Sequence, residues 1–171
     1  MSHPFSPFHG SFAFNEWLFD SAMKALSESN ADRRLSNSTN TPRGIAVHLV
    51  VSRHSLLRLL GADIPDLPWK DVGEKFEAGF KIDGEKPRLD AIQQSWDRLK
   101  PVLADRMRET PQQILTQPSP MPVPGVPDAT VTDFAKLNVI HESYHLGQLG
   151  LLVKDITGKG IMTPPEKVTG A

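Results

Sequence analysis

Hydrophobic residues recur at intervals of three or four positions between residues 12 and 29, in the segment FAFNEWLFDSAMKALSES. This spacing places the recurring residues on one face of an α-helix. Ser11 stands where a serine N-cap would begin such a helix. The sequence therefore predicts a first helix that packs through this face, followed by a polar loop over residues 29–41. The residues assigned to the face are Phe14, Trp17, Leu18, Ala22, Ala25 and Leu26.

A second helix is predicted from Thr41 and Pro42 to Gly61. Threonine suits the cap, proline suits the first turn, and glycine suits the end of a helix. The segment RGIAVHLVVSRHSLLRLL between them is apolar on more than one side, which is typical of a central bundle helix. The chain is mixed from residue 62 to residue 86, where we predict only a short helical turn at 69–77.

A third helix is predicted over residues 87–108, where we expect Pro101 to kink or restart it. A fourth is predicted from Thr130 or Thr132 to about Thr157. Its expected apolar contacts are Phe134, Leu137, Ile140, Tyr144, Leu149 and Leu152, and those of the third helix are Leu89, Ile92, Trp96, Leu99, Leu103 and Met107.

The connection between these two helices, residues 110–130, is rich in proline, which favours extended backbone and predicts a long crossover. No alternating strand pattern appears. Four helices with long connections predict an all-α protein, a four-helix bundle with long crossover connections. We expect a single domain over residues 1–171, with a core at about 11–157, a flexible N-terminal arm and a flexible C-terminal tail.

The overall composition narrows the classes of partner. The formal net charge is −1, and no basic run is present, so nothing favours nucleic acid. No apolar run is long enough to span a membrane, and the first residues lack the pattern of a signal peptide. The absence of cysteine excludes disulfides and thiolate ligands from this chain and fits a cytoplasmic location.

The stretch HESYH, residues 141–145, carries the most specific chemistry in the chain. His141 and His145 are four positions apart on a helix, so both imidazoles lie on one face and can bind one metal ion. The stretch also matches the H-E-x-x-H pattern of zinc proteases, in which the glutamate acts as a base. The metzincin form fails here, since Gln148 and Leu151 occupy the positions of its glycine and third histidine. Glu166 is the only downstream glutamate, and it follows two prolines near the end of the sequence.

The second helix offers His48 and His54 as a third metal ligand. They are six positions apart, so only one of them can point to a given site. His48 lies in an apolar stretch, whereas His54 has polar neighbours and is expected to be more exposed, so His48 is preferred. The alternative is that His48 is a core histidine bonded to a neighbour.

The string from His145 to Gln148, with His141 one turn earlier, resembles the H-x-x-x-H-x-G-Q signature near the end of DinB-like proteins. The segment from Thr41 to Gly61 is also similar, and so is the order of four helices with a long crossover. The resemblance covers about residues 11–157. It implies a four-helix bundle with a three-histidine site for a divalent metal ion, commonly nickel or zinc. The ligands carried over are His48, His141 and His145.

The same superfamily includes thiol-dependent transferases. The resemblance therefore implies a metal-dependent transferase that acts on a small molecule and uses a low-molecular-weight thiol. Gln148 and Glu142 are candidates to hold the ring N–H groups or a bound water. Two alternatives stay open, a metal-dependent hydrolase and a non-enzymatic bundle with a structural or vestigial site. Such bundles often self-associate, so we also expect a possible homodimer, with Phe5 and Phe8 of the N-terminal arm as possible contacts.

Overall fold

A computed structural model describes residues 6–37, 39–69 and 86–162 of the chain. These residues form four long helices, α1 (His9–Ala25), α2 (Pro42–Leu59), α4 (Leu89–Glu109) and α6 (Val131–Thr157). A 3-10 turn, η1 (Ser6–Phe8), precedes α1, and a short helix, α5 (Gln112–Leu115), follows α4. The described residues contain isolated β-bridges and no β-strand, so the predicted all-α helical bundle is confirmed. The helical turn predicted at 69–77 lies outside the described residues, except for Trp69.

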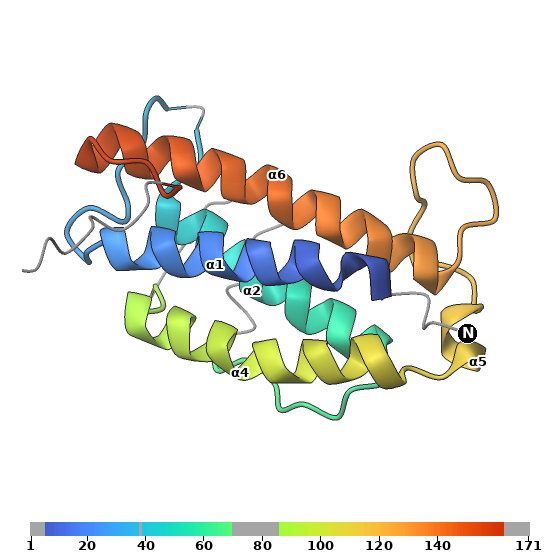
Figure 1. Ribbon diagram of the computed structural model, residues 1–171. Coiled ribbons are helices and arrows are strands. Elements are labelled where there is room, and N and C mark those ends of the chain that lie inside the picture. The colour runs from blue at the N-terminus through green and yellow to red at the C-terminus, as the bar shows by residue number, and fades with distance from the viewer. Residues whose placement is uncertain (1–5, 38, 70–85, 163–171) are drawn as a thin grey trace, which may run out of the picture.

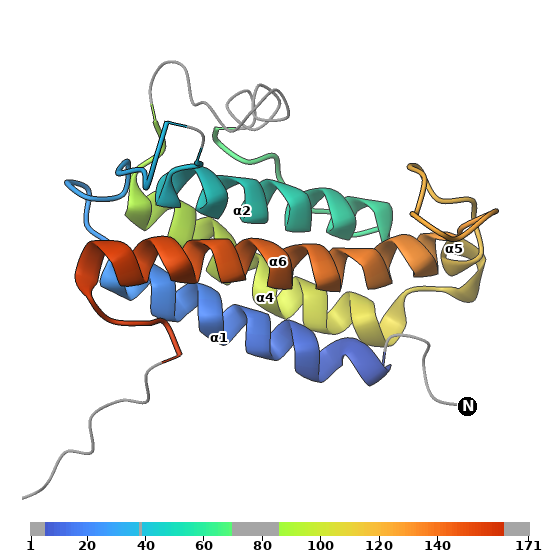
Figure 2. The same cartoon turned by 90° about the horizontal axis from the view of Figure 1, so that it is seen from above.

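The four long helices surround one core (Figures 1 and 2). The chain runs one way along α1 and α6 and the opposite way along α2 and α4. Helices α4 and α6 lie diagonally opposite each other, so the connection between them crosses the end of the bundle. None of the described helices is long and apolar enough to cross a membrane. The single-domain boundaries at residues 1 and 171 stay a prediction.

Side-chain caps fix the starts of the two helices that carry the histidine cluster. At α2, the hydroxyl of Thr41 accepts a hydrogen bond from the backbone N–H of Gly44, and Pro42 occupies the first turn, as predicted. At α6, Thr130 and Asp133 form a reciprocal capping box. Helix α6 ends at Gly158, whose φ of 74° is a left-handed conformation that favours glycine. The starts of both helices and the end of α6 are therefore encoded in local sequence.

The predicted face of α1 is only partly correct. Leu18 and Ala22 are buried as expected, but Phe14 and Trp17 are exposed and stack on each other. Other residues of α1 are buried in their place, among them Phe12, Asn15, Phe19 and Met23. The segment has aromatic residues on two sides, so more than one face of the helix has hydrophobic residues at helical spacing. Only packing against α4 and α6 determines which face is buried. The helix also begins at His9, so Ser11 is not its cap.

The predicted contacts of α4 are confirmed, whereas those of α6 are mixed. All six residues assigned to the buried stripe of α4 are buried, and the helix continues through Pro101 without a restart. In α6, however, Ile140 is 67% exposed and Tyr144 is 63% exposed. The core face of α6 instead contains the polar residues Asn138, Glu142 and His145. An apolar stripe could not reveal this face, because polar side chains occupy part of it.

The proline-rich connection is a long crossover, as predicted, but it is not extended throughout, because it contains the short helix α5. Leu115 of α5 is buried against the core. The chain then leaves the bundle and returns, because the N–H of Val131 donates to the carbonyl of Gln117 at 2.9 Å and that of Ser119 donates to Ala129 at 2.7 Å. Residues 117–131 thus close on themselves as a loop at one end of α6 (Figure 1).

Candidate metal centre

Helices α2 and α6 bring three histidines together. His48 comes from α2, and His141 and His145 come from adjacent turns of α6. One ring nitrogen of each can be chosen so that all three lie within 4.8 Å of one another. The Nε2 atoms of His48 and His141 are 2.9 Å apart. The structure therefore joins the two histidines of the HESYH stretch with His48, the upstream residue preferred from the sequence.

The spacing of one pair of ring nitrogens, those of His48 and His141, suits a transition-metal ion. Imidazole nitrogens bind zinc at about 2.0–2.1 Å, so two ligands at 90–109° around one ion are about 2.9–3.4 Å apart. The distance between His48 and His141 falls at the lower end of this range. Three neutral imidazoles favour zinc, nickel, copper or iron over magnesium and calcium, which prefer oxygen ligands. Three protein ligands also leave a position open for a water or substrate atom.

Burial keeps the histidines of the cluster neutral. Burial, followed by the neighbouring rings of His145 and His141, lowers the pKa of His48 to about 3. Burial, followed by the ring of His145, lowers the pKa of His141 to about 4. Burial also lowers the pKa of His145, although the hydrogen bond to Gln148 acts in the opposite direction. All three rings are therefore uncharged at neutral pH, which is the form that binds metal.

Two polar side chains orient the rings on α6. Nδ1 of His145 lies 2.8 Å from Oε1 of Gln148, so that nitrogen is the N–H donor and Nε2 keeps its lone pair. On the other ring, Nδ1 of His141 lies 3.5 Å from the hydroxyl of Ser52, which in turn donates to Oδ1 of Asn138 at 3.3 Å. In both rings the second nitrogen faces a fixed oxygen, and Nε2 is left for the cluster.

Replacing Gln148 by leucine is expected to weaken metal binding by about 10–100-fold, because the side chain that fixes the His145 ring is lost. Saturating metal should still give one ion per chain, since all three histidines remain. Titration against a competing chelator measures the affinity. Gln148→Glu is the matched control, because it keeps an oxygen that accepts from Nδ1. Equal affinities in the wild type and the leucine variant would contradict the role of Gln148.

The metal-free protein is expected to lose stability as the pH falls from 6.5 to about 3. The folded-state pKa values of His48 and His141 lie below the ordinary value of 6.5, so the unfolded chain binds more protons in this window. The free energy of unfolding therefore rises with pH up to about 6.5 and gains nothing from these groups above it. Thermal unfolding in the presence of chelator tests this. A His48→Gln/His141→Gln variant should show a shallower pH dependence, and an identical dependence would contradict the prediction.

Glu142 lies in a buried ion pair in the core. Its two carboxylate oxygens accept hydrogen bonds from Nε and Nη2 of Arg53 at 2.8 and 2.7 Å. Arg53 is 0% exposed and Glu142 is 1% exposed. Arg53 also bonds Glu16 at 2.8 Å and stacks over the ring of Trp96. The carboxylate that would act as the base of a zinc protease is thus engaged by a guanidinium.

The remaining sequence candidates are placed elsewhere. His54 was expected to be more exposed than His48, and this was wrong. His54 is buried, and its Nε2 lies 3.0 Å from the carbonyl of Pro65, whereas His48 is only partly buried. The polar neighbours of His54 in sequence did not reveal the chain segment that covers it. His9 is exposed, and Phe8 packs against the core. His3 and Phe5 lie outside the described residues.

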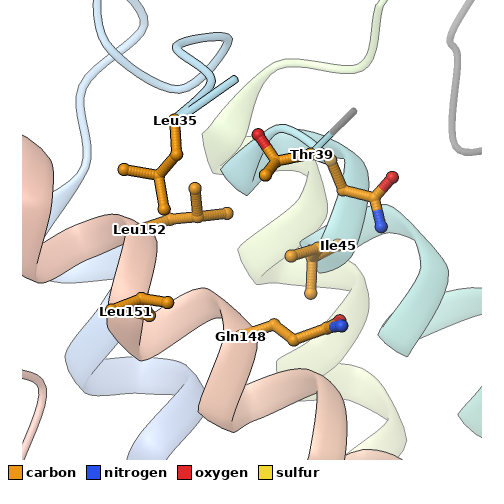
Figure 3. A pocket seen from close by; sticks show the side chains of 7 residues that line it. Leu35, Thr39, Ile45, Gln148, Leu151 and Leu152 are labelled. Carbon is orange, nitrogen blue, oxygen red and sulfur yellow. The ribbon is translucent and has the colours of Figure 1, made fainter. Parts of the chain in front are cut away.

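Two pockets flank the cluster along the groove between α2 and α6. The first, here called the Met121 pocket, has a volume of about 520 Å³ and is lined by residues that include His48, Ser52, Met121, Phe134, Asn138 and His141. The second, the Gln148 pocket, has a volume of about 240 Å³ and is lined by residues that include Asn40, Ile45, Gln148 and Leu152 (Figure 3). Because α2 and α6 are antiparallel, the two pockets lie at opposite ends of the cluster.

Sequence inspection missed several residues that surround the cluster. The position of Ser52 could have been predicted, because it lies one turn after His48 and must share its helix face. The same is true of Asn138, three positions before His141. Arg53 gives no signal of its partner in sequence, and Met121 comes from a loop whose course depends on the tertiary structure.

The comparisons with known proteins agree with this arrangement. No curated protein and no solved structure matches the chain. The family model described as the DinB superfamily matches residues 12–149, which include α2, all three histidines and Gln148. Since this match covers most of the chain, the protein belongs to the DinB superfamily.

Proposed function

We propose that His48, His141 and His145 bind one divalent ion, nickel or zinc, and that the protein is a metal-dependent transferase. It would move a small organic group onto a low-molecular-weight thiol. The observation that carries the proposal is the convergence of three neutral imidazoles from two capped helices, with the second nitrogen of His141 and of His145 facing a fixed oxygen. This donor set leaves the ion with its full charge and an open position.

The composition of the chain determines where the sulfur nucleophile must come from. The sequence contains no cysteine, so the sulfur nucleophile has to arrive with a co-substrate. A bound divalent ion lowers the pKa of a thiol that coordinates it. In the transfer, the thiol loses its proton to solvent, a sulfur–carbon bond forms, and the bond from that carbon to its leaving group breaks with the electron pair going to the leaving group. The Met121 pocket is lined by His48 and His141, and the Gln148 pocket by the side chain that hydrogen-bonds His145, so two reactants would approach from opposite ends of the cluster.

A metal-dependent hydrolase is the second candidate, since the same ion could activate a water. The ion pair between Arg53 and Glu142 argues against a protease, in which the Glu142 carboxylate would be the base. A Glu142→Gln variant separates the two candidates. Assayed below its melting temperature, the variant should keep thiol-dependent activity if the glutamate is structural, whereas it should be metal-bound and inactive if the glutamate is the base.

The decisive experiment combines metal analysis with turnover. Protein purified without chelator should contain about one nickel or zinc per chain, and a panel of low-molecular-weight thiols should be consumed with electrophiles only when metal is present. Removal of the metal should abolish the reaction, and reloading should restore it. A protein that takes up no divalent ion would overturn the proposal and favour a non-enzymatic bundle. The homodimer and the cytoplasmic location stay predictions.

A further inference from the structure

The Met121 pocket has the size and composition of a site for an organic molecule. Its volume of about 520 Å³ falls within the range of about 300–1,000 Å³ that is usual for ligand pockets. The Gln148 pocket, at about 240 Å³, is smaller than that range. Two of the three histidines, His48 and His141, line the Met121 pocket directly. A molecule bound there therefore lies against the candidate metal centre.

The lining of this pocket carries no acidic side chain, lysine or arginine among the described residues. Its apolar walls come from three elements, with Val51 and Leu59 on α2, Phe134 on α6, and Pro120 and Met121 on the loop. The polar groups are few. Ser52 and Asn138 hydrogen-bond each other near His141, and Ser55 lies on the exposed side of α2. A charged group placed away from the histidines would lose its hydration without gaining a partner of opposite charge, which is unfavourable.

We propose that the Met121 pocket binds the electrophilic substrate of the transferase, and that this substrate is a molecule with an uncharged, mainly apolar body. Its reactive carbon faces His48 and His141, and its apolar body lies between Phe134, Leu59 and Met121. The role of this molecule as the electrophile rests on the proposed function. The size and chemistry of the ligand, however, follow from the pocket alone.

The test uses the metal-loaded protein and N-phenyl-1-naphthylamine, an uncharged aromatic probe whose fluorescence rises in apolar surroundings. The wild type should bind it saturably, at one probe per chain. Ser55→Phe fills the pocket from an exposed position and should weaken binding by at least about tenfold. Asn40→Phe fills the Gln148 pocket and is the matched control, with binding expected within about twofold of the wild type. Metal content and melting temperature should stay unchanged in both variants.

A second readout separates this inference from the proposed function. With 1-chloro-2,4-dinitrobenzene as the electrophile, Ser55→Phe should raise the KM for the electrophile and leave the KM for the thiol unchanged. Normal turnover and normal probe binding in Ser55→Phe would overturn the assignment of the pocket and leave the proposed function intact. Saturable binding that depends on Ser55, without any thiol-dependent reaction, would overturn the proposed function and support only the class of ligand. No saturable binding to the wild type would overturn the inference.

Discussion

Replacing His48, His141 or His145 by alanine is expected to weaken metal binding by more than about 100-fold. Loss of a residue that only orients a metal ligand costs about 10–100-fold, and loss of a ligand itself should cost more. The proposed site has three protein ligands, so each variant would leave two. Elemental analysis after dialysis and competition with a chelator measure the effect. Thiol-dependent activity should be lost together with the metal.

His54→Gln is the matched control for the histidine variants. His54 lies on the same helix as His48 and is buried, but it bonds the carbonyl of Pro65 and is not one of the three clustered histidines. Its replacement should leave the metal content at about one ion per chain. A His141→Ala protein that binds the ion with wild-type affinity would refute the proposed ligand set.

Replacing Arg53 by methionine is expected to lower the free energy of unfolding by about 3–5 kcal/mol. Removal of one partner from a buried ion pair leaves the other charge without compensation, and here it would leave Glu142 in the core. For a chain of this length, such a loss corresponds to a fall of roughly 6–20 °C in melting temperature. Thermal and denaturant unfolding measure it.

Two further variants show whether the charge or the packing is responsible. Arg53→Met/Glu142→Leu removes both charges and should recover much of the stability lost in Arg53→Met. Arg108→Met breaks the exposed pair with Asp105 and should change the stability by no more than about 0.5 kcal/mol. If Arg53→Met melted within about 2 °C of the wild type, the ion pair would have no large role in stability.

The buried pair also connects the core to the candidate metal centre. Glu142 follows His141 directly on α6, and Arg53 follows Ser52 directly on α2. The two hydrogen bonds between Arg53 and Glu142 therefore fix the rotation of α6 and its position along the helix axis relative to α2, next to the histidines. The H-E-x-x-H motif associates Glu142 with catalysis, but its ion pair with Arg53 gives this carboxylate a structural role.

The sequence alone was sufficient where local signals agree. The caps at Thr41 and Thr130 and the glycine at residue 158 mark helix ends, because backbone groups at a helix end must be satisfied locally. The stripe of α4 is correctly predicted because its opposite face is strongly polar. The pairing of His141 with His145 follows from helical periodicity, since residues four apart share a face.

Only the tertiary structure decided the features that depend on contacts between distant segments. The buried face of α1 was ambiguous, because Phe14 and Trp17 match helical spacing as well as Phe12 and Phe19 do. The burial of His54 depends on the chain near Pro65, and the partner of Glu142 lies 89 positions away on α2. The Met121 pocket exists because the proline-rich loop returns to the end of α6. Periodicity determines which residues share a face, but the packing of one helix on another determines what that face meets.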